Sequence, residues 1–314
     1  MLSYLKIVRP LNLLIIIASM FLMRYCVIMP FLQFNDLHLQ LSFFDFVLLV
    51  LSVLFIAAGG YVVNDYYDMK ADMVNKDCNK MVIGTKMTLK EAMRFYVILT
   101  FLGLAFGFWF SLELGDWNFF SLFLLVGGLL WFYSTTYKTI MFVGNLLVSV
   151  LVALVPLLVV IFEMVLFKEN FSESIEKGEI NYMPIFYFVL GFSIFAFFTN
   201  FIREIVKDVE DVEGDKKAEK KTFPIFAGFT NSKVLSFVLI LIEILALYFV
   251  YFKFLNDYYS LYYITIAVVL PLLYALFLVL RAKENKDFGK VSKVLKFVMV
   301  LGLGYSFLIC IQLS

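Results

Sequence analysis

The chain has 314 residues, of which 63% are hydrophobic and 16% are charged, and its formal net charge is +1 at pH 7. Soluble domains are about 45–50% apolar, so this composition excludes an ordinary soluble globular protein. It also excludes a disordered chain, and three cysteines are too few for a disulfide framework. One membrane-spanning helix needs about 20 mostly apolar residues. We therefore predict an all-α, polytopic membrane protein with about nine transmembrane helices, surrounded by membrane lipids and without a nucleic-acid partner.

The apolar runs, taken in chain order, predict nine spans. They cover residues 11–33, 43–66, 88–112, 117–136, 140–163, 184–206, 232–252, 259–281 and 292–313. The first run follows two basic residues, as a signal peptide would, but it is too long and no small-residue cleavage site follows it. We interpret it as a true span. No linker divides the chain, so we expect a single domain over residues 1–314.

The basic residues are distributed unevenly between the two predicted sides of the membrane. One side holds 22 of the 26 Lys and Arg residues, and the other holds Arg24, Lys168, Lys177 and Lys253. Cytoplasmic loops of membrane proteins are enriched in Lys and Arg. We therefore predict a multi-pass protein of the cytoplasmic membrane with a cytoplasmic N-terminus. The most basic loops should face the cytoplasm.

Two groups of three aspartates lie at the cytoplasmic ends of the second and sixth predicted spans. The groups are Asp65, Asp68 and Asp72, and Asp208, Asp211 and Asp215. Both have spacings of three and four, which place a trio within about 60° on one helix face. Stacked carboxylates repel one another unless a cation neutralises them, and oxygen ligands suit Mg²⁺ or Ca²⁺. A solvated acidic face is the alternative, but the repeated spacing favours a metal site.

A metal site of this kind predicts a phosphorylated substrate. Mg²⁺ takes one or two carboxylates and completes its coordination with water and substrate phosphates. Basic residues beside the aspartates can hold further phosphate oxygens, although the enrichment of cytoplasmic loops in basic residues would also place them there. The apolar body of the protein can accommodate a hydrocarbon tail. An isoprenoid diphosphate combines both properties.

Two sequence motifs resemble those of the UbiA superfamily of intramembrane prenyltransferases. NDYYDMKAD matches the motif N-D-x-x-D-x-x-x-D, and DVEGD matches D-x-x-x-D. The segments KIVRPLN and YSTTYKTIMFVGN are also similar to family segments, so the resemblance covers nearly the whole chain. The run REIVKDVEDVEGD, followed by KKTFPI, looks most like the digeranylgeranylglyceryl phosphate synthase branch.

The resemblance implies an enzyme that uses Mg²⁺ to transfer a prenyl group from an allylic isoprenoid diphosphate, releasing pyrophosphate. Cytoplasmic loops would cap the active site. The six aspartates named above are the expected metal ligands. Expected catalytic residues are Asp68, Asp211, Lys138 and Tyr137. Expected substrate-binding residues are Asn64, Arg9, Asn12, Tyr133, Asn145, Arg203, Lys207 and Lys221.

The resemblance of REIVKDVEDVEGD to the digeranylgeranylglyceryl phosphate synthase branch implies geranylgeranylglyceryl phosphate or a similar lipid as the acceptor. The basic loops also hold more cations than one diphosphate requires, which leaves cations for a second phosphate. An aromatic quinone precursor is the alternative acceptor. A transporter of polyisoprenoid phosphates is a further alternative, but transporters usually place charged sites near the membrane midplane. His38, the single histidine, falls in an outer loop. An obligatory histidine base is therefore not expected.

Overall fold

The computed structural model describes residues 2–75, 81–178 and 180–313, and the helices in these ranges confirm the all-α fold. The α-helices are α1 (Leu2–Ile7), α2 (Pro10–Leu22), α3 (Met29–Phe34), α4 (Phe43–Tyr67), α5 (Met69–Asn75), α6 (Leu89–Glu113), α7 (Phe120–Thr135), α8 (Val143–Asn170), α9 (Ser172–Glu176), α10 (Met183–Glu210), α11 (Val212–Lys217), α12 (Phe223–Val250), α13 (Tyr258–Tyr263), α14 (Leu270–Arg281) and α15 (Phe288–Leu313). Short π or 3₁₀ turns lie between them at η1 (Met23–Ile28), η3 (Trp117–Phe119), η4 (Tyr137–Thr139), η5 (Tyr251–Leu255), η6 (Ile264–Val269) and η7 (Asn285–Asp287).

Nine helical segments of the described residues are long and apolar enough to cross a membrane, as predicted. They are Pro10–Phe34, Phe43–Tyr67, Leu89–Glu113, Trp117–Thr135, Val143–Asn170, Met183–Glu210, Phe223–Leu255, Tyr258–Arg281 and Asn285–Leu313. Several extend beyond the apolar run, because backbone hydrogen bonds continue a helix into polar sequence. The seventh begins at Phe223 rather than at 232, with a proline in its first turn, and it is kinked at Gly228, whose φ is 79°.

The chain forms two compact units. The first contains Met1–Met20, Gln40–Leu151 and Glu213–Lys220, and the second contains Phe21–Leu39, Val152–Val212 and Lys221–Ser314. The prediction of one domain over residues 1–314 stays a prediction.

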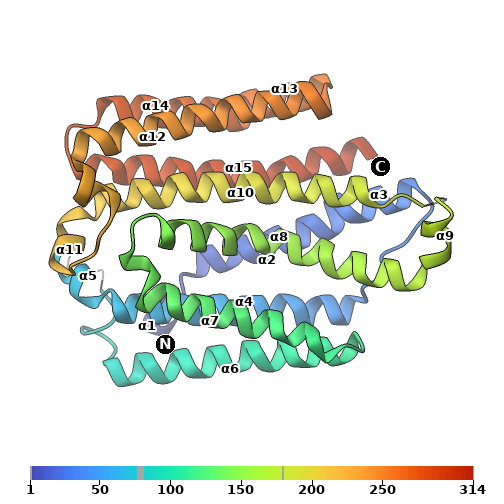
Figure 1. The fold of residues 1–314 in the computed structure, drawn as a ribbon, viewed down its shortest axis with the longest axis horizontal. Coiled ribbons are helices and arrows are strands. Elements are labelled where there is room, and N and C mark those ends of the chain that lie inside the picture. The colour runs from blue at the N-terminus through green and yellow to red at the C-terminus, as the bar shows by residue number, and fades with distance from the viewer. Residues whose placement is uncertain (1, 76–80, 179, 314) are drawn as a thin grey trace. The chain divides into compact units, whose positions relative to one another are not determined.

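In the first unit, α4 packs against both α6 and α7 (Figure 1). Gly103 of α6 allows the close approach to α4, because a Cβ there would lie 2.8 Å from the backbone nitrogen of Ile56. The Ser52 hydroxyl of α4 donates a hydrogen bond of 2.8 Å to the Gly103 carbonyl. Small residues and interhelical hydrogen bonds are the usual means of joining helices in a membrane. They fix α4, whose end carries the first aspartate group.

In the second unit, α15 packs against α10 and α14, and α12 packs against the same two helices (Figure 1). Two buried ionisable side chains inside this unit lie beside polar partners. Arg24 and Glu163 lie 3.9 Å apart with almost no exposed surface. Glu243, which lies in the middle of a span, accepts a hydrogen bond from Thr199 of α10. These pairings reduce the cost of burying polar side chains among apolar helices.

Each aspartate group lies at a break between two helices. α4 ends at Tyr67, Asp68 is the break, and α5 begins at the next residue. α10 ends at Glu210, with Asp211 at the corresponding break before α11. The Asp68 N–H still donates to the Asn64 carbonyl, at 3.0 Å. The sequence predicted one continuous helix face for each group, whereas the structure interrupts the helix at the middle aspartate of both.

Candidate active site

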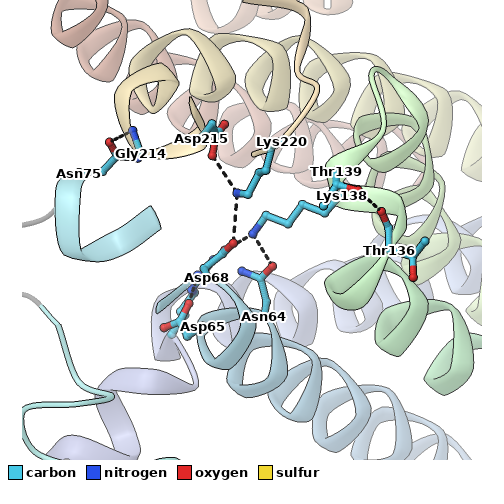
Figure 2. Close-up of polar contacts among 11 residues, drawn as sticks. Asn64, Asp65, Asp68, Asn75, Thr136, Lys138, Thr139, Gly214, Asp215 and Lys220 are labelled. Carbon is cyan, nitrogen blue, oxygen red and sulfur yellow. Dashed lines mark hydrogen bonds and ion pairs between the residues drawn. The ribbon is translucent and has the colours of Figure 1, made fainter. Parts of the chain in front are cut away.

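A polar cluster occupies the end of α4 in the first unit. It is built from the α4–α5 junction, the η4 turn and residues 213–220, and Figure 2 shows its side chains pointing toward one another. Asp68 and Lys220 are 152 residues apart in sequence but meet here. The cluster therefore depends on the tertiary structure.

The carboxylate of Asp68 lies at the centre of the cluster. Lys138 makes an ion pair with Asp68 Oδ2 and also donates a hydrogen bond of 2.7 Å to Asn64 Oδ1. Lys220 Nζ lies 3.2 Å from Asp68 Oδ1 (Figure 2). The Asp68 side chain is only 14% exposed. Two ammonium groups therefore balance one largely buried carboxylate.

Lys220 also contacts Asp215, and so bridges the two aspartate motifs. Its Nζ lies 2.8 Å from Asp215 Oδ1, and its backbone N–H donates to the Asp215 carbonyl at 3.0 Å. Asp215 is 3% exposed. Glu219 has a positive φ of 56° and reverses the chain after α11. This turn brings Lys220 back to the aspartate that precedes it by five residues.

Asp65 is paired with a different cation. Arg9 Nη2 lies 2.6 Å from Asp65 Oδ1, and the Arg9 guanidinium lies over the ring of Tyr61 at 5.1 Å. The ring of Tyr133 lies 5.9 Å from Lys138 Nζ in a similar arrangement. Such contacts attract a cation toward the face of an aromatic ring.

The opposite charges of the cluster stabilise one another's ionised forms. Burial alone would raise the pKa of Asp68, but the ammonium groups of Lys138 and Lys220 outweigh it and hold this pKa well below its usual range. Burial alone would lower the pKa of Lys220, but Asp68 and Asp215 raise it above its usual value. The Asp68 carboxylate and the Lys220 ammonium group are therefore charged at neutral pH.

The donor set of this cluster fits a hard divalent cation. Carboxylate and amide oxygens from Asn64, Asp65, Asp68 and Asp215 are the ligands that Mg²⁺ prefers. Within the described ranges, no three His, Cys, Asp or Glu side chains are grouped as metal ligands. The carboxylates are paired with Arg9, Lys138 and Lys220 instead. The carboxylates of the cluster therefore already bind cationic side chains.

The structure brings together only some of the predicted site residues. Those in the cluster or beside it are Arg9, Asn64, Asp65, Asp68, Tyr133, Lys138 and Asp215. Others in the first unit are Asn12 in α2, Asp72 in α5, Tyr137 at the start of η4 and Asn145 in α8. Those in the second unit are Arg203, Lys207, Asp208, Asp211 and Lys221. Arg203 is paired there with Glu204, at 2.8 Å. The predicted roles of all these residues stay predictions.

Sequence analysis did not single out Lys220 among the basic residues beside the aspartates, and it missed Asn75 and Gly214. Lys220 lies in the run KKAEKK, where spacing alone does not single out one lysine. The positive φ of Glu219 turns the chain so that Lys220 lies beside Asp215 and Asp68. Asn75 Oδ1 accepts a hydrogen bond of 2.8 Å from the Gly214 N–H, which joins α5 to α11 (Figure 2). The sequence offered no signal for this pair beyond the presence of Asn75 and Gly214 near the aspartates.

Comparison with known families gives a match over most of the chain. The sequence pattern of the UbiA prenyltransferase family matches residues 36–300 of this chain. A curated relative from Methanosphaera stadtmanae, named digeranylgeranylglyceryl phosphate synthase, is 30% identical over 79% of this chain and 81% of its own length. A relative of the same name from Methanothermobacter thermautotrophicus is 30% identical over 95% of this chain and 92% of its own length.

Solved structures are similar in fold over nearly the whole chain. A structure from work on digeranylgeranylglyceryl phosphate synthase in membranes has a TM-score of 0.63 and 25% identity, covering 99% of this chain and 98% of its own. A UbiA homologue from Archaeoglobus fulgidus, bound to GPP and Mg²⁺, has a TM-score of 0.57 and 19% identity, covering 98% of this chain and 99% of its own. The second likeness concerns the fold alone.

The bridging position of Lys220 gives a test of the cluster. Lys220→Gln leaves Asp68 and Asp215 without their shared cation, and we expect a loss of about 1.5–3 kcal/mol in the free energy of unfolding. Thermal unfolding in detergent, followed by circular dichroism, should show a lower midpoint. Added Mg²⁺ should raise the midpoint of this variant more than that of the wild type. Lys217→Gln is the matched control, because Lys217 is exposed. Equal midpoints for the two variants would contradict the bridging role.

Proposed function

Because the chain belongs to the UbiA prenyltransferase family, we propose that it transfers a prenyl group from an allylic isoprenoid diphosphate to a phosphorylated lipid acceptor, with Mg²⁺ as cofactor. The observation that carries the proposal is the bridge from Asp68 through Lys220 to Asp215. It joins residues of both aspartate motifs at one buried, charged cluster. Family membership also favours an enzyme over the alternative of a transporter.

The proposed Mg²⁺ ligands in the first unit are Asp65, Asp68, Asp72 and Asp215. Asp208 and Asp211 are the proposed ligands from the second unit. Bound Mg²⁺ would supply electrostatic stabilisation of the negative charge that develops on the leaving diphosphate. The low pKa of Asp68 supports this role, because the carboxylate is already ionised.

The lysines of the cluster would hold the diphosphate. Lys138 and Lys220 each present an ammonium group beside Asp68, and ammonium groups bind phosphate oxygens as point charges. Arg9 keeps the Asp65 carboxylate in place through its ion pair. The proposed role of Tyr133 and Tyr137 is to stabilise the allylic cation with their ring faces. Asn12, Asn145, Arg203, Lys207 and Lys221 are proposed as further substrate contacts.

The proposed acceptor is geranylgeranylglyceryl phosphate or a close phosphorylated lipid. Relatives named digeranylgeranylglyceryl phosphate synthase, at 30% identity over most of the chain, support this choice. The basic residues near the motifs support it as well, because a second phosphate requires further cations. An alcohol acceptor needs only late loss of a proton to water or a carboxylate. This chemistry is consistent with a chain whose one histidine, His38, falls in a predicted outer loop.

The first test of the function concerns the aspartates. Asp68→Asn keeps the size of the side chain but removes its charge, and we expect turnover to fall by about 10² or more. The same loss is expected for Asp211→Asn. Pyrophosphate release by the purified protein with Mg²⁺, geranylgeranyl diphosphate and the acceptor geranylgeranylglyceryl phosphate is the measurement. Asp36→Asn, in an exposed loop with a positive φ that Asn tolerates, is the control. Near-normal turnover in both Asp68→Asn and Asp211→Asn would refute the two-motif site.

The second test identifies the acceptor. With geranylgeranyl diphosphate as donor, transfer to geranylgeranylglyceryl phosphate should clearly exceed transfer to 4-hydroxybenzoate, 1,4-dihydroxy-2-naphthoate or homogentisate, with products identified by mass. A strong preference for one of these rings would overturn the lipid acceptor and favour an aromatic prenyltransferase. It would leave the prenyl transfer itself intact.

We also propose that the site faces the cytoplasm, because 22 of the 26 basic residues fall on the side of the aspartate motifs in the predicted topology. Cys78 follows the first motif and lies outside the described residues. In a Cys26→Ser, Cys310→Ser background, a membrane-impermeant thiol reagent should label Cys78 only when it reaches the cytoplasmic face. Labelling of intact cells from outside would invert the proposed orientation.

A further inference from the structure

Two uncharged residues join the segments that carry the aspartates of the cluster. Asn75 is the last residue of α5, and Gly214 lies in α11. The Gly214 N–H donates a hydrogen bond of 2.8 Å to Asn75 Oδ1 across 139 residues of sequence (Figure 2). Asn75 thus accepts this hydrogen bond at the last residue of α5, and Asp68 immediately precedes the first residue of the same helix.

The contact requires a glycine at position 214 because the two helices approach closely. A Cβ there would lie 2.6 Å from the carbonyl oxygen of Ala71 and would overlap the side chain of Asn75. The Ala71 carbonyl belongs to the backbone of α5, so it cannot move aside as a flexible side chain can. Any larger residue at position 214 would therefore separate α11 from α5.

This docking determines where Asp215 and Lys220 lie. Asp215 directly follows Gly214, and the N–H of Ala218 donates to the Gly214 carbonyl at 2.9 Å. The turn through Glu219 then returns Lys220 to Asp215, from which Lys220 reaches Asp68. Residues 213–220 belong to the first unit, although the chain on either side of them belongs to the second. A displacement of Gly214 would be transmitted to both charged groups.

We propose that Asn75 is a positioning residue for the prenyl transfer reaction, and that its hydrogen bond to Gly214 sets the position of Asp215 and Lys220 relative to Asp68. The proposal rests on the proposed function, because the reaction it serves is that of the Asp68 site. Asn75 itself acts through α11.

The docking can be measured without metal or substrate. Trypsin cleaves after lysine, and α11 with its following turn contains Lys216, Lys217, Lys220 and Lys221. We expect Asn75→Ala and Gly214→Ala to raise the cleavage rate at these lysines by about fivefold, the equivalent of one lost hydrogen bond. Cleavage is followed by mass spectrometry in detergent. Asn75→Asp keeps an oxygen acceptor and should restore slow cleavage.

The matched control is Gly128→Ala in α7, where an added Cβ meets no atom within 4 Å. Trypsin should cleave this variant at the wild-type rate, and its kcat should equal that of the wild type. In Asn75→Ala and Gly214→Ala, kcat should fall by about tenfold or more, because a misplacement of about 1 Å can cost about 10²-fold. The concentration of Mg²⁺ for half-maximal activity should rise. Helical content at the assay temperature, from circular dichroism, should stay unchanged.

Two results would overturn the proposal. One is wild-type cleavage in both variants, whether or not their activity is lost, and the other is faster cleavage with undiminished activity. If the wild-type protein itself transferred no prenyl group, the proposed function would fail and the positioning role with it. The trypsin comparison would still report whether Asn75 holds α11 on α5, so the two failures are distinguishable.

Discussion

The charge balance at Asp68 is the interaction on which the candidate site depends. A carboxylate that is 14% exposed would be costly without a counter-charge, and two ammonium groups from distant parts of the chain supply it. One comes from the η4 turn and the other from the turn after α11. Because Lys220 also pairs with Asp215, the same charge joins both aspartate motifs. A divalent cation and a diphosphate would enter a site whose charges are already arranged in alternation.

The close approach of backbones lets these charges meet. Gly103 brings α6 against α4, and Gly214 brings α11 against α5. Apolar side chains alone do not favour one particular packing of helices in a membrane, because lipid tails are equally apolar. Small residues and specific hydrogen bonds, such as those of Ser52 and Asn75, select the arrangement instead. The helix ends that carry Asp68 and Asp215 are positioned by these contacts.

Polar groups deep in the second unit follow the same principle of pairing. Arg24 faces Glu163, and Glu243 accepts a hydrogen bond from Thr199. An ionisable residue within a span is by default a candidate for function. Here the pairs join η1 to α8 and α12 to α10, so a role in holding helices together accounts for both. The reactive charges of the proposed enzyme lie at the ends of spans.

The sequence by itself determined the class of protein, the nine spans and both aspartate motifs. These properties depend on local hydrophobicity and on residues close together in the chain, such as Asn64, Asp65 and Asp68. The sequence could not distinguish Lys220 from the lysines beside it, or reveal that Asn75 accepts from Gly214. Those choices depend on a positive φ at Glu219 and on a contact across 139 residues. Only the tertiary structure decided them, because the energy of an ion pair depends on distance in space and not on separation along the chain.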